Sequence, residues 1–246
     1  MKIRHALSAL LAGAFLVAAP AASAARVEQT TVETIGNVEF TFPVPPGYAK
    51  PAATPPAMRD LMTHALPPTN RLVTVMVTQQ FLDDLQAGNT TSNKARYLGV
   101  QSFRSIEQSG VNPEMFDQLK AMFRNQSDQM LEKAKSFETD SAARLSDDIG
   151  KLSADSNASV KMSDQSLLGI FDEQPDSISL CAVQLLSASV HDQKTQMKQV
   201  MAMTAVRLRG KVLMVGIYSS DHSQADVDWV KEQARAWNKR MHELNP

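Results

Sequence analysis

The chain has 246 residues, and its 25 basic and 26 acidic residues leave a formal net charge of −1. A chain this close to neutral has no general electrostatic attraction to nucleic acid, so we expect no nucleic-acid partner. Its single cysteine excludes an internal disulfide, and the apolar context of Cys181 in ISLCAVQLL predicts an unreactive thiol in the core.

The first 24 residues have the features of a secretory signal peptide. Lys2 and Arg4 precede an apolar run, and Ala22-Ser23-Ala24 fits the small-residue rule for cleavage after Ala24. An uncleaved membrane anchor is the alternative, but the run is shorter than the roughly 20 residues that span a bilayer. We therefore expect a periplasmic or secreted protein, residues 25–246, without a membrane span after cleavage.

The N-terminal part of this product, from Asn37 to about Gln86, contains two predicted strands. NVEFTF alternates apolar and polar residues, and RLVTVMVT is apolar on both sides. Eight prolines lie in the stretch between them, Phe40–Asn70. A short strand cannot form a core alone, so we expect this stretch to wrap across the surface between two strands of one sheet, with a short helix in PPAMRDLMTHAL. A peptide ligand of the PxxP type is the alternative interpretation.

The middle part, Thr90–Asn157, has the pattern of helices. SNKARYLGVQSFRSIEQSG has apolar residues near helical spacing and ends at Gly110, and Asn112-Pro113 suits the start of a second helix. An apolar stripe then follows, with Lys120 and Arg124 on the opposite face: Phe116, Leu119, Phe123, Met130, Ala134 and Phe137. We expect a helical hairpin that packs this stripe on the sheet. A hairpin that projects and binds a partner is the alternative.

Four strand candidates follow one another in the C-terminal part: SLLGIFDE, SISLCAVQLLSAS, KQVMAMTAVRLRG and KVLMVGIYSS. Arg209-Gly210 predicts a tight turn between the last two, and the apolar residues on both sides of VLMVGIY indicate a central strand. A long helix closes the chain, with Ser223 as N-cap and one apolar seam that contains Trp237.

Together these elements predict an α+β fold. We expect a mostly antiparallel sheet of about six strands, covered by helices, with a helical hairpin inserted between strands at about residues 90–157. Residues 25–246 are expected to form a single domain.

Three features resemble a known family: the strand end F-x-F-P with Gly47-Tyr48, the antiparallel meander, and the closing segment RGKVLMVGIYSSDHSQADVDWVKEQARAW. They resemble the α/β/α sandwich of PsbP, the extrinsic subunit of photosystem II. The Ran-binding nuclear import factor and the bacterial DcrB-like exported proteins are similar. The resemblance covers about half of the chain and implies a sandwich fold, but no site residue. The whole chain also resembles uncharacterised proteobacterial exported proteins, which imply no activity.

The sequence contains none of the common catalytic or metal-binding patterns. The histidines of the expected mature chain are isolated from one another, and no HExxH, GxSxG, P-loop or GxGxxG pattern occurs. Asp221, His222 and Ser223 are the residue types of a catalytic triad, but neighbours in sequence do not converge as one, so we expect a strand exit and a helix cap. We therefore expect no catalytic residue, no cofactor and no metal.

Three basic residues, Arg207, Arg209 and Lys211, lie at the tip of the predicted C-terminal hairpin. We interpret them as a solvated turn and as the candidates for contact with an acidic partner or a lipid headgroup. The function that these observations favour is a non-catalytic binding or accessory module of the cell envelope, with another envelope protein as its partner. The alternative is a hydrolase whose site is assembled from residues far apart in the sequence.

Overall fold

The computed structural model describes residues 28–87, 95–125 and 127–246. The expected signal peptide, residues 1–24, lies outside the described residues. The side chains of Met130, Ala134 and Phe137, which belong to the expected apolar stripe, also lie outside the described part.

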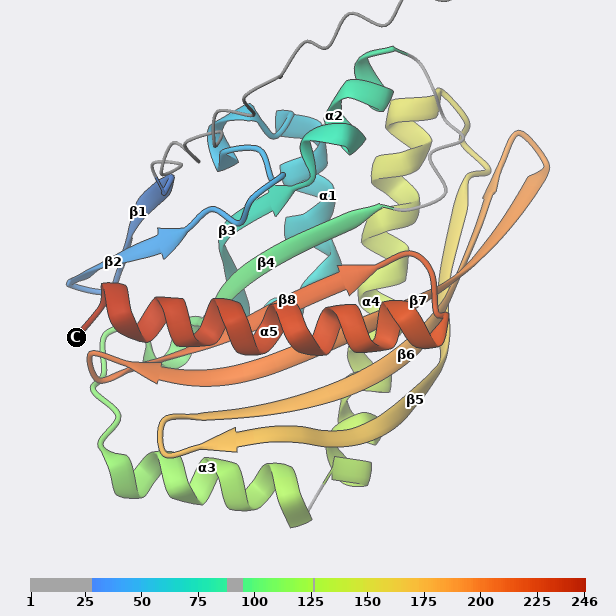
Figure 1. The fold of residues 1–246 in the computed structure, drawn as a ribbon. Helices are drawn as coiled ribbons and strands as arrows, with labels where there is room; N and C mark the ends of the chain where they lie inside the picture. Colours follow the sequence, from blue (N-terminus) through green and yellow to red (C-terminus); the bar gives the residue numbers. More distant parts are fainter. Residues whose placement is uncertain (1–27, 88–94, 126) are drawn as a thin grey trace, which may run out of the picture.

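A six-stranded antiparallel sheet forms the centre of the molecule (Figure 1). Its order is β3-β4-β8-β7-β6-β5. The strands span Asn70–Val77 (β3), Arg96–Phe103 (β4), Ser159–Gln174 (β5), Ser177–Val190 (β6), Gln193–Leu208 (β7) and Lys211–Ser219 (β8). The predicted α+β class and the mostly antiparallel sheet of about six strands are confirmed. The tight turn at Arg209-Gly210 is also confirmed, because both residues have positive φ and Leu208 pairs with Lys211.

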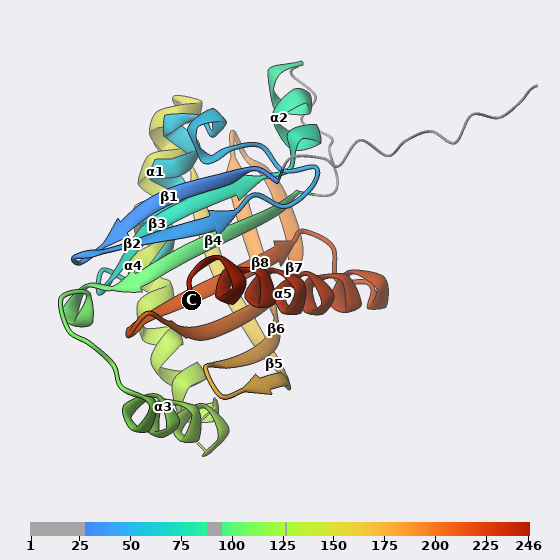
Figure 2. The same ribbon diagram turned by 60° about the vertical axis from the view of Figure 1, so that its left-hand side comes forward.

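Helices cover both faces of this sheet (Figures 1 and 2). On one face, called the α5 face, lies α5 (Gln224–Leu244). On the other, called the α4 face, lie α1 (Pro56–Ala65), α3 (Pro113–Asn125) and α4 (Ser127–Ser153). A short helix, α2 (Gln79–Gln86), follows β3. None of the helices in the described ranges is both long enough and apolar enough to cross a membrane.

The α5 face is a close-packed core. The apolar seam of α5 is buried on the sheet, and Trp237 is only 5% exposed. Its indole Nε1 donates a hydrogen bond to the carbonyl oxygen of Pro43 at 2.8 Å, and its ring stacks on Phe42 with centroids 6.0 Å apart. Ser223 caps the helix by accepting a hydrogen bond from the backbone N–H of Asp226. Cys181 is buried in the same core, and burial raises the pKa of its thiol.

One prediction for the N-terminal part is wrong, and one strand there was not predicted. NVEFTF forms β2 (Val38–Pro43), which pairs with β1 (Thr30–Ile35) in a separate two-stranded sheet and not with β3. The strand β1 was not predicted, because only Ile35 in it is buried and the pattern lacks an apolar face. The expected short helix is confirmed as α1. The proline-rich stretch carries the chain from β2 around the edge of the sheet to α1 and β3, and on the way Ala49 N–H donates to the carbonyl oxygen of Val77 at 2.9 Å.

The middle part is not helical throughout. Its first predicted helix contains β4, which lies between β3 and β8. In this strand Leu98 and Val100 face the core on the α5 side, whereas Tyr97 and Gln101 face the opposite side. The segment therefore forms a strand whose side chains alternate between the two faces, because the neighbouring strands β3 and β8 provide hydrogen-bonding partners for its backbone. The predicted hairpin reduces to α3 and α4, inserted between β4 and β5.

The stripe on α3 packs on the sheet. Phe116 and Phe123 are buried against Ile178 and Met214 on the α4 face. Lys120, expected on a solvent-facing side, is 5% exposed instead. Its Nζ donates hydrogen bonds to the carbonyl oxygens of Gln174 at 3.2 Å and Pro175 at 3.0 Å, so it fixes the β5–β6 turn.

The edge strand β5 is irregular. Its pairing with β6 shifts register in three places, between Ser163 and Ser166, Leu167 and Gly169, and Ile170 and Asp172. Gly169 has a φ of 109°, a backbone conformation that favours glycine. The exposed apolar side chains of Leu168 and Ile170 lie in this irregular part of the strand.

Candidate ligand-binding cavity

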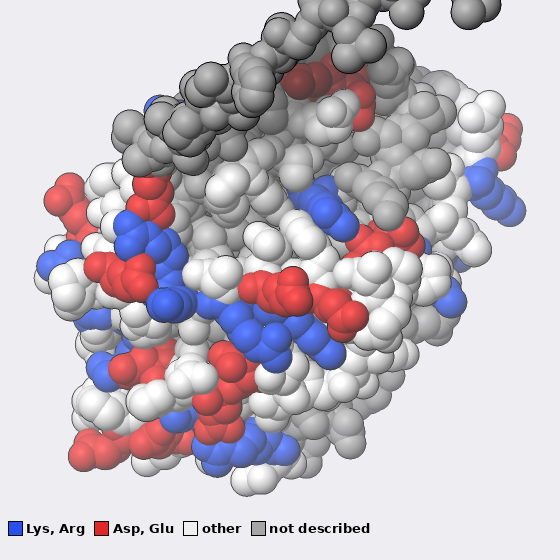
Figure 3. Space-filling view, in the orientation of Figure 1, with Lys and Arg blue, Asp and Glu red and all other residues white. Residues whose placement is uncertain are grey.

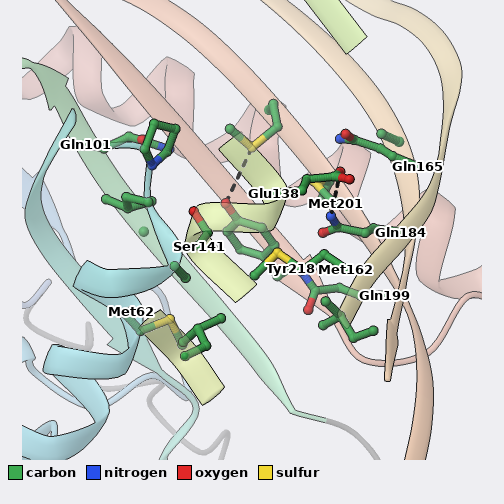
Figure 4. Close-up of a pocket in the computed structure, with 18 of the residues that line it drawn as sticks. Met62, Gln101, Glu138, Ser141, Met162, Gln165, Gln184, Gln199, Met201 and Tyr218 are labelled. Carbon is green, nitrogen blue, oxygen red and sulfur yellow. Dashed lines mark hydrogen bonds between the residues drawn. The ribbon is translucent and has the colours of Figure 1, made fainter. Parts of the chain in front are cut away.

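A cavity of about 730 Å³ lies between the α4 face of the sheet and the helices α1 and α4 (Figure 4). This volume is within the range of roughly 300–1,000 Å³ that is typical of small-molecule sites. All six strands of the large sheet contribute to its lining, so the cavity extends across the sheet and is not a defect between two side chains.

The floor of the cavity consists of alternate residues on the long strands β6 and β7. From β6 come Leu180, Ala182, Gln184, Leu186 and Ala188, and from β7 come Thr195, Met197, Gln199, Met201 and Met203. Because side chains on a strand alternate between its two faces, each of these sets is a single row that points into the cavity. The methionine side chains on this floor are flexible and polarizable, so they can adapt to the shape of a ligand.

The roof consists of α1 and α4. The α4 residues Glu138, Ser141, Leu145 and Ile149 recur at steps of three and four, so they form one stripe toward the cavity. Two interactions hold α4 against the end of α1. Arg144 donates hydrogen bonds to the carbonyl oxygens of His64 at 3.2 Å and Leu66 at 3.0 Å, and the His64 ring contacts the carboxylate of Asp148.

Two stacked tyrosines form part of the floor on the central strands. Tyr97 on β4 and Tyr218 on β8 are cross-strand neighbours, and their rings lie 4.4 Å apart between centroids. Burial raises the pKa of Tyr97 well above its usual range, and burial raises the pKa of Tyr218 to about 12. Both groups are therefore neutral phenols near neutral pH. The Tyr218 ring lies directly over Gly216, where any side chain would overlap it.

A line of polar side chains crosses the otherwise apolar floor and reaches the roof. We call it the polar belt, and it comprises Tyr97, Glu138, Gln165, Gln184 and Gln199. Gln184 and Gln199 are direct partners on β6 and β7. The Tyr97 hydroxyl donates to Gln199 Oε1 at 3.1 Å, and Gln184 Nε2 donates to Glu138 Oε1 at 3.2 Å.

The described lining of the cavity includes Glu138 but no Asp, His, Cys, Lys or Arg. Its Ser141 hydroxyl accepts a hydrogen bond from Arg144 Nη2 at 3.0 Å. Among the described residues no serine hydroxyl is bonded to His64, so the His64–Asp148 contact is not part of a nucleophilic triad in this structure. Nor do three or more His, Cys, Asp or Glu side chains gather anywhere in the described ranges in a way that could hold a metal ion.

The three basic residues of the C-terminal hairpin do not form one solvated tip. Arg207 is paired with Asp176, with Nη2 and Oδ1 2.5 Å apart. Lys211 is 5% exposed, and its Nζ donates to the carbonyl oxygens of Glu107 at 2.8 Å and Ser109 at 3.1 Å. Only Arg209 is exposed, and it donates to the carbonyl oxygen of Glu39. The interpretation as a solvated turn is therefore wrong for Lys211, which holds a loop in place.

The charges on the described part of the face that carries α5 are mixed in sign. Figure 3 shows Lys and Arg side chains interspersed with Asp and Glu along this face. Some of the α5 charges are paired, since Arg240 contacts Glu28 and Glu243.

The cavity was not predicted from the sequence, although one signal for it was present. In SLCAVQLLSAS and TQMKQVMAM a glutamine takes the place of an apolar residue within an otherwise apolar row. A polar residue in the middle of a buried row needs a hydrogen-bonding partner or a ligand, and such a residue can mark a binding surface.

Known proteins give no further guide to this cavity. No family model matches the chain, and no curated protein sequence matches it.

Proposed function

We propose that the protein is an exported, non-catalytic binding module of the cell envelope, and that its cavity holds a small molecule with an apolar body. The observation that carries the proposal is the cavity of about 730 Å³ with a mainly apolar lining from all six strands and from α1, α3 and α4. The apolar side chains of this lining lack the packing contacts that a protein interior normally provides, and a bound apolar body would supply them.

The lining supports binding over hydrolysis. A hydrolase needs a nucleophile or an activated water beside a base. The described lining has serine and threonine hydroxyls at Ser141, Ser187 and Thr195 but no histidine, and its one carboxylate is bonded to a glutamine. The resemblance to the PsbP-like sandwich remains part of the proposal, and the helices on both faces of the sheet support it.

The uptake of a neutral fluorescent dye, N-phenylnaphthylamine, tests the proposal. We expect one saturable site in the purified protein. Ala182 points into the cavity from the middle of β6, so Ala182→Phe fills part of the space and should weaken the dye by at least about tenfold, equivalent to roughly 1.4 kcal/mol. Ala236→Phe, on the exposed side of α5, is the matched control and should bind the dye as the parent does.

Two results would contradict the proposal. One is the absence of saturable binding in the parent protein. The other is equal binding in the parent and in a folded Ala182→Phe variant, since that would place the dye elsewhere.

Export is a separate part of the proposal, and it rests on the charged start, the short apolar run and the Ala-Ser-Ala site. The intact mass of protein recovered from the envelope fraction tests it. A mass that includes residues 1–24 would contradict cleavage after Ala24.

A further inference from the structure

The polar belt lies in the middle of the cavity floor. On β7, Met201 and Met203 lie on one side of Gln199 and Met197 lies on the other. On β6, Gln184 likewise has Ala182 on one side and Leu186 on the other. A ligand that fills the cavity along these strands therefore meets apolar walls at both ends and hydrogen-bonding groups between them.

The belt is only partly satisfied by the protein. Gln199 uses its Oε1 to accept from Tyr97, and within the described residues no acceptor is bonded to its Nε2. Gln184 must turn its Nε2 toward the Glu138 carboxylate, and no donor from the described part of the chain is bonded to its Oε1. Gln199 is buried, with 4% of its surface exposed. Its Nε2 atom is nevertheless not among the fully buried side-chain atoms without a hydrogen-bond partner, so it keeps some accessible surface. The amides thus present one donor and one acceptor toward the hollow.

The charge of the lining argues against an anionic ligand group. Glu138 is the one charged residue in the described lining, and it is a carboxylate. A fatty-acid carboxylate or a phosphate placed at the belt would lose its hydration, and no cation of the described lining would pair with it. A neutral group that both donates and accepts would lose less hydration and could bond to both amides.

We propose that the cavity selects uncharged over anionic amphiphiles, and that the hydrogen-bonding group of the ligand, an amide, an ester or an alcohol, is held by Gln184 and Gln199 at the polar belt. This inference rests on the proposed function, because it names the class of ligand for the same cavity.

Competition between matched amphiphiles tests the inference. Tetradecanamide and ionised tetradecanoate have the same number of carbon atoms and differ in the charge of the head. Tetradecanoate is used below its micelle-forming concentration and tetradecanamide below its solubility limit, each to displace N-phenylnaphthylamine from the purified protein. We expect tetradecanamide to displace the dye at a concentration at least about tenfold lower than tetradecanoate, as one or two net hydrogen bonds would produce.

A variant of the belt locates the preference. In the double variant Gln184→Met/Gln199→Met, the cavity keeps its volume but loses both amides. The advantage of tetradecanamide over the charged head should then fall at least about tenfold, while dye binding remains. Gln196→Met, at an exposed position of β7, is the control for an added methionine on the same strand. Thermal unfolding of each variant checks that it folds, and the comparison of the two heads in the parent protein needs no variant.

The outcomes separate this inference from the proposed function. If the dye does not bind the parent protein, the proposed function fails. If the dye binds but tetradecanoate displaces it as well as tetradecanamide does, the selection of uncharged over anionic ligands is wrong and the cavity remains a binding site. An unchanged preference for tetradecanamide in the folded double variant would overturn the role of Gln184 and Gln199.

Discussion

The two faces of the six-stranded sheet differ although the same strands form both. On the α5 face, Val200, Val206, Leu213 and Ile217 are buried against a helix whose seam is also buried. On the α4 face, alternate residues of the same strands border a hollow of about 730 Å³. The difference shows that the two faces of one sheet can be packed differently: the α5 face is filled by the side chains of a helix, whereas part of the α4 face is left open beneath α4.

The two helices explain the difference. α5 lies directly on β7 and β8 and its Trp237 reaches the backbone of Pro43, so little space is left. α4 packs mainly on the edge strand β5, and its brace to α1 places it as a roof over the sheet. The side chains on the cavity floor do not fill the space between the sheet and this roof.

Removal of Trp237 should have the largest effect on stability. Trp237→Ala takes away the stacking on Phe42 and a buried hydrogen bond in the close-packed face, so we expect a loss of about 3–5 kcal/mol in the free energy of unfolding. Chemical denaturation measures it. Met201→Ala enlarges a hollow that already exists, so it should cost no more than the lower end of the range for such changes, about 2 kcal/mol. Equal losses for the two variants would remove the distinction between the faces.

The buried cation on α3 should give the next largest effect. Lys120→Glu places a carboxylate against the carbonyl oxygens of Gln174 and Pro175, and we expect a loss of about 3 kcal/mol, since each bond to a charged group contributes about 1.5–3 kcal/mol. Arg124→Glu, one turn further on the exposed side, breaks only a surface pair with Glu173 and should destabilise several-fold less. Thermal melts of both variants decide the point, and a milder effect at Lys120 than at Arg124 would contradict a structural role for α3.

Two neighbouring glycines give a smaller and more local contrast on the hollow face. Gly216→Ala forces a methyl group into the Tyr218 ring, which is stacked on Tyr97, so we expect a loss of about 1–3 kcal/mol. Gly99, its cross-strand partner, has open space in front of it, and Gly99→Ala should change stability by less than about 1 kcal/mol. Urea titration of the two variants measures the contrast. Similar losses would mean that the tyrosine stack does not constrain this part of the floor.

Much of the fold follows from local patterns in the sequence. The four C-terminal strands, the turn at Arg209-Gly210 and the seam of α5 were predicted because each has strong periodicity and clear boundaries. β4 was mistaken for a helix because Ala95, Leu98 and Phe103 lie near helical spacing, and only the pairing with β3 and β8 resolves the ambiguity. Lys120 was placed on the wrong side because its long side chain reaches a turn that is distant in sequence.

The cavity, in contrast, does not follow from local patterns in the sequence. Its floor residues alternate like those of any buried strand, so periodicity alone cannot distinguish a packed face from a hollow one. The distance between the sheet and α4 depends on how α4 packs against β5 and α1, and these contacts join residues far apart in the chain. The only local sign of the cavity that we identify in the sequence is the pair of glutamines Gln184 and Gln199, each of which interrupts an apolar row.

The irregular pairing of β5 has a consequence for how molecules of this protein meet. A long, regular outer strand with apolar side chains such as Leu168 and Ile170 would be a template on which a second molecule could add a strand and start a fibre. The three register shifts interrupt the spacing of the outward amides, so an approaching strand would find no continuous ladder to join. At the opposite edge of the sheet, the Ala49 N–H already donates to the carbonyl oxygen of Val77, the last residue of β3. The register shifts thus make β5 a poor template for a further strand, although apolar side chains are exposed on it.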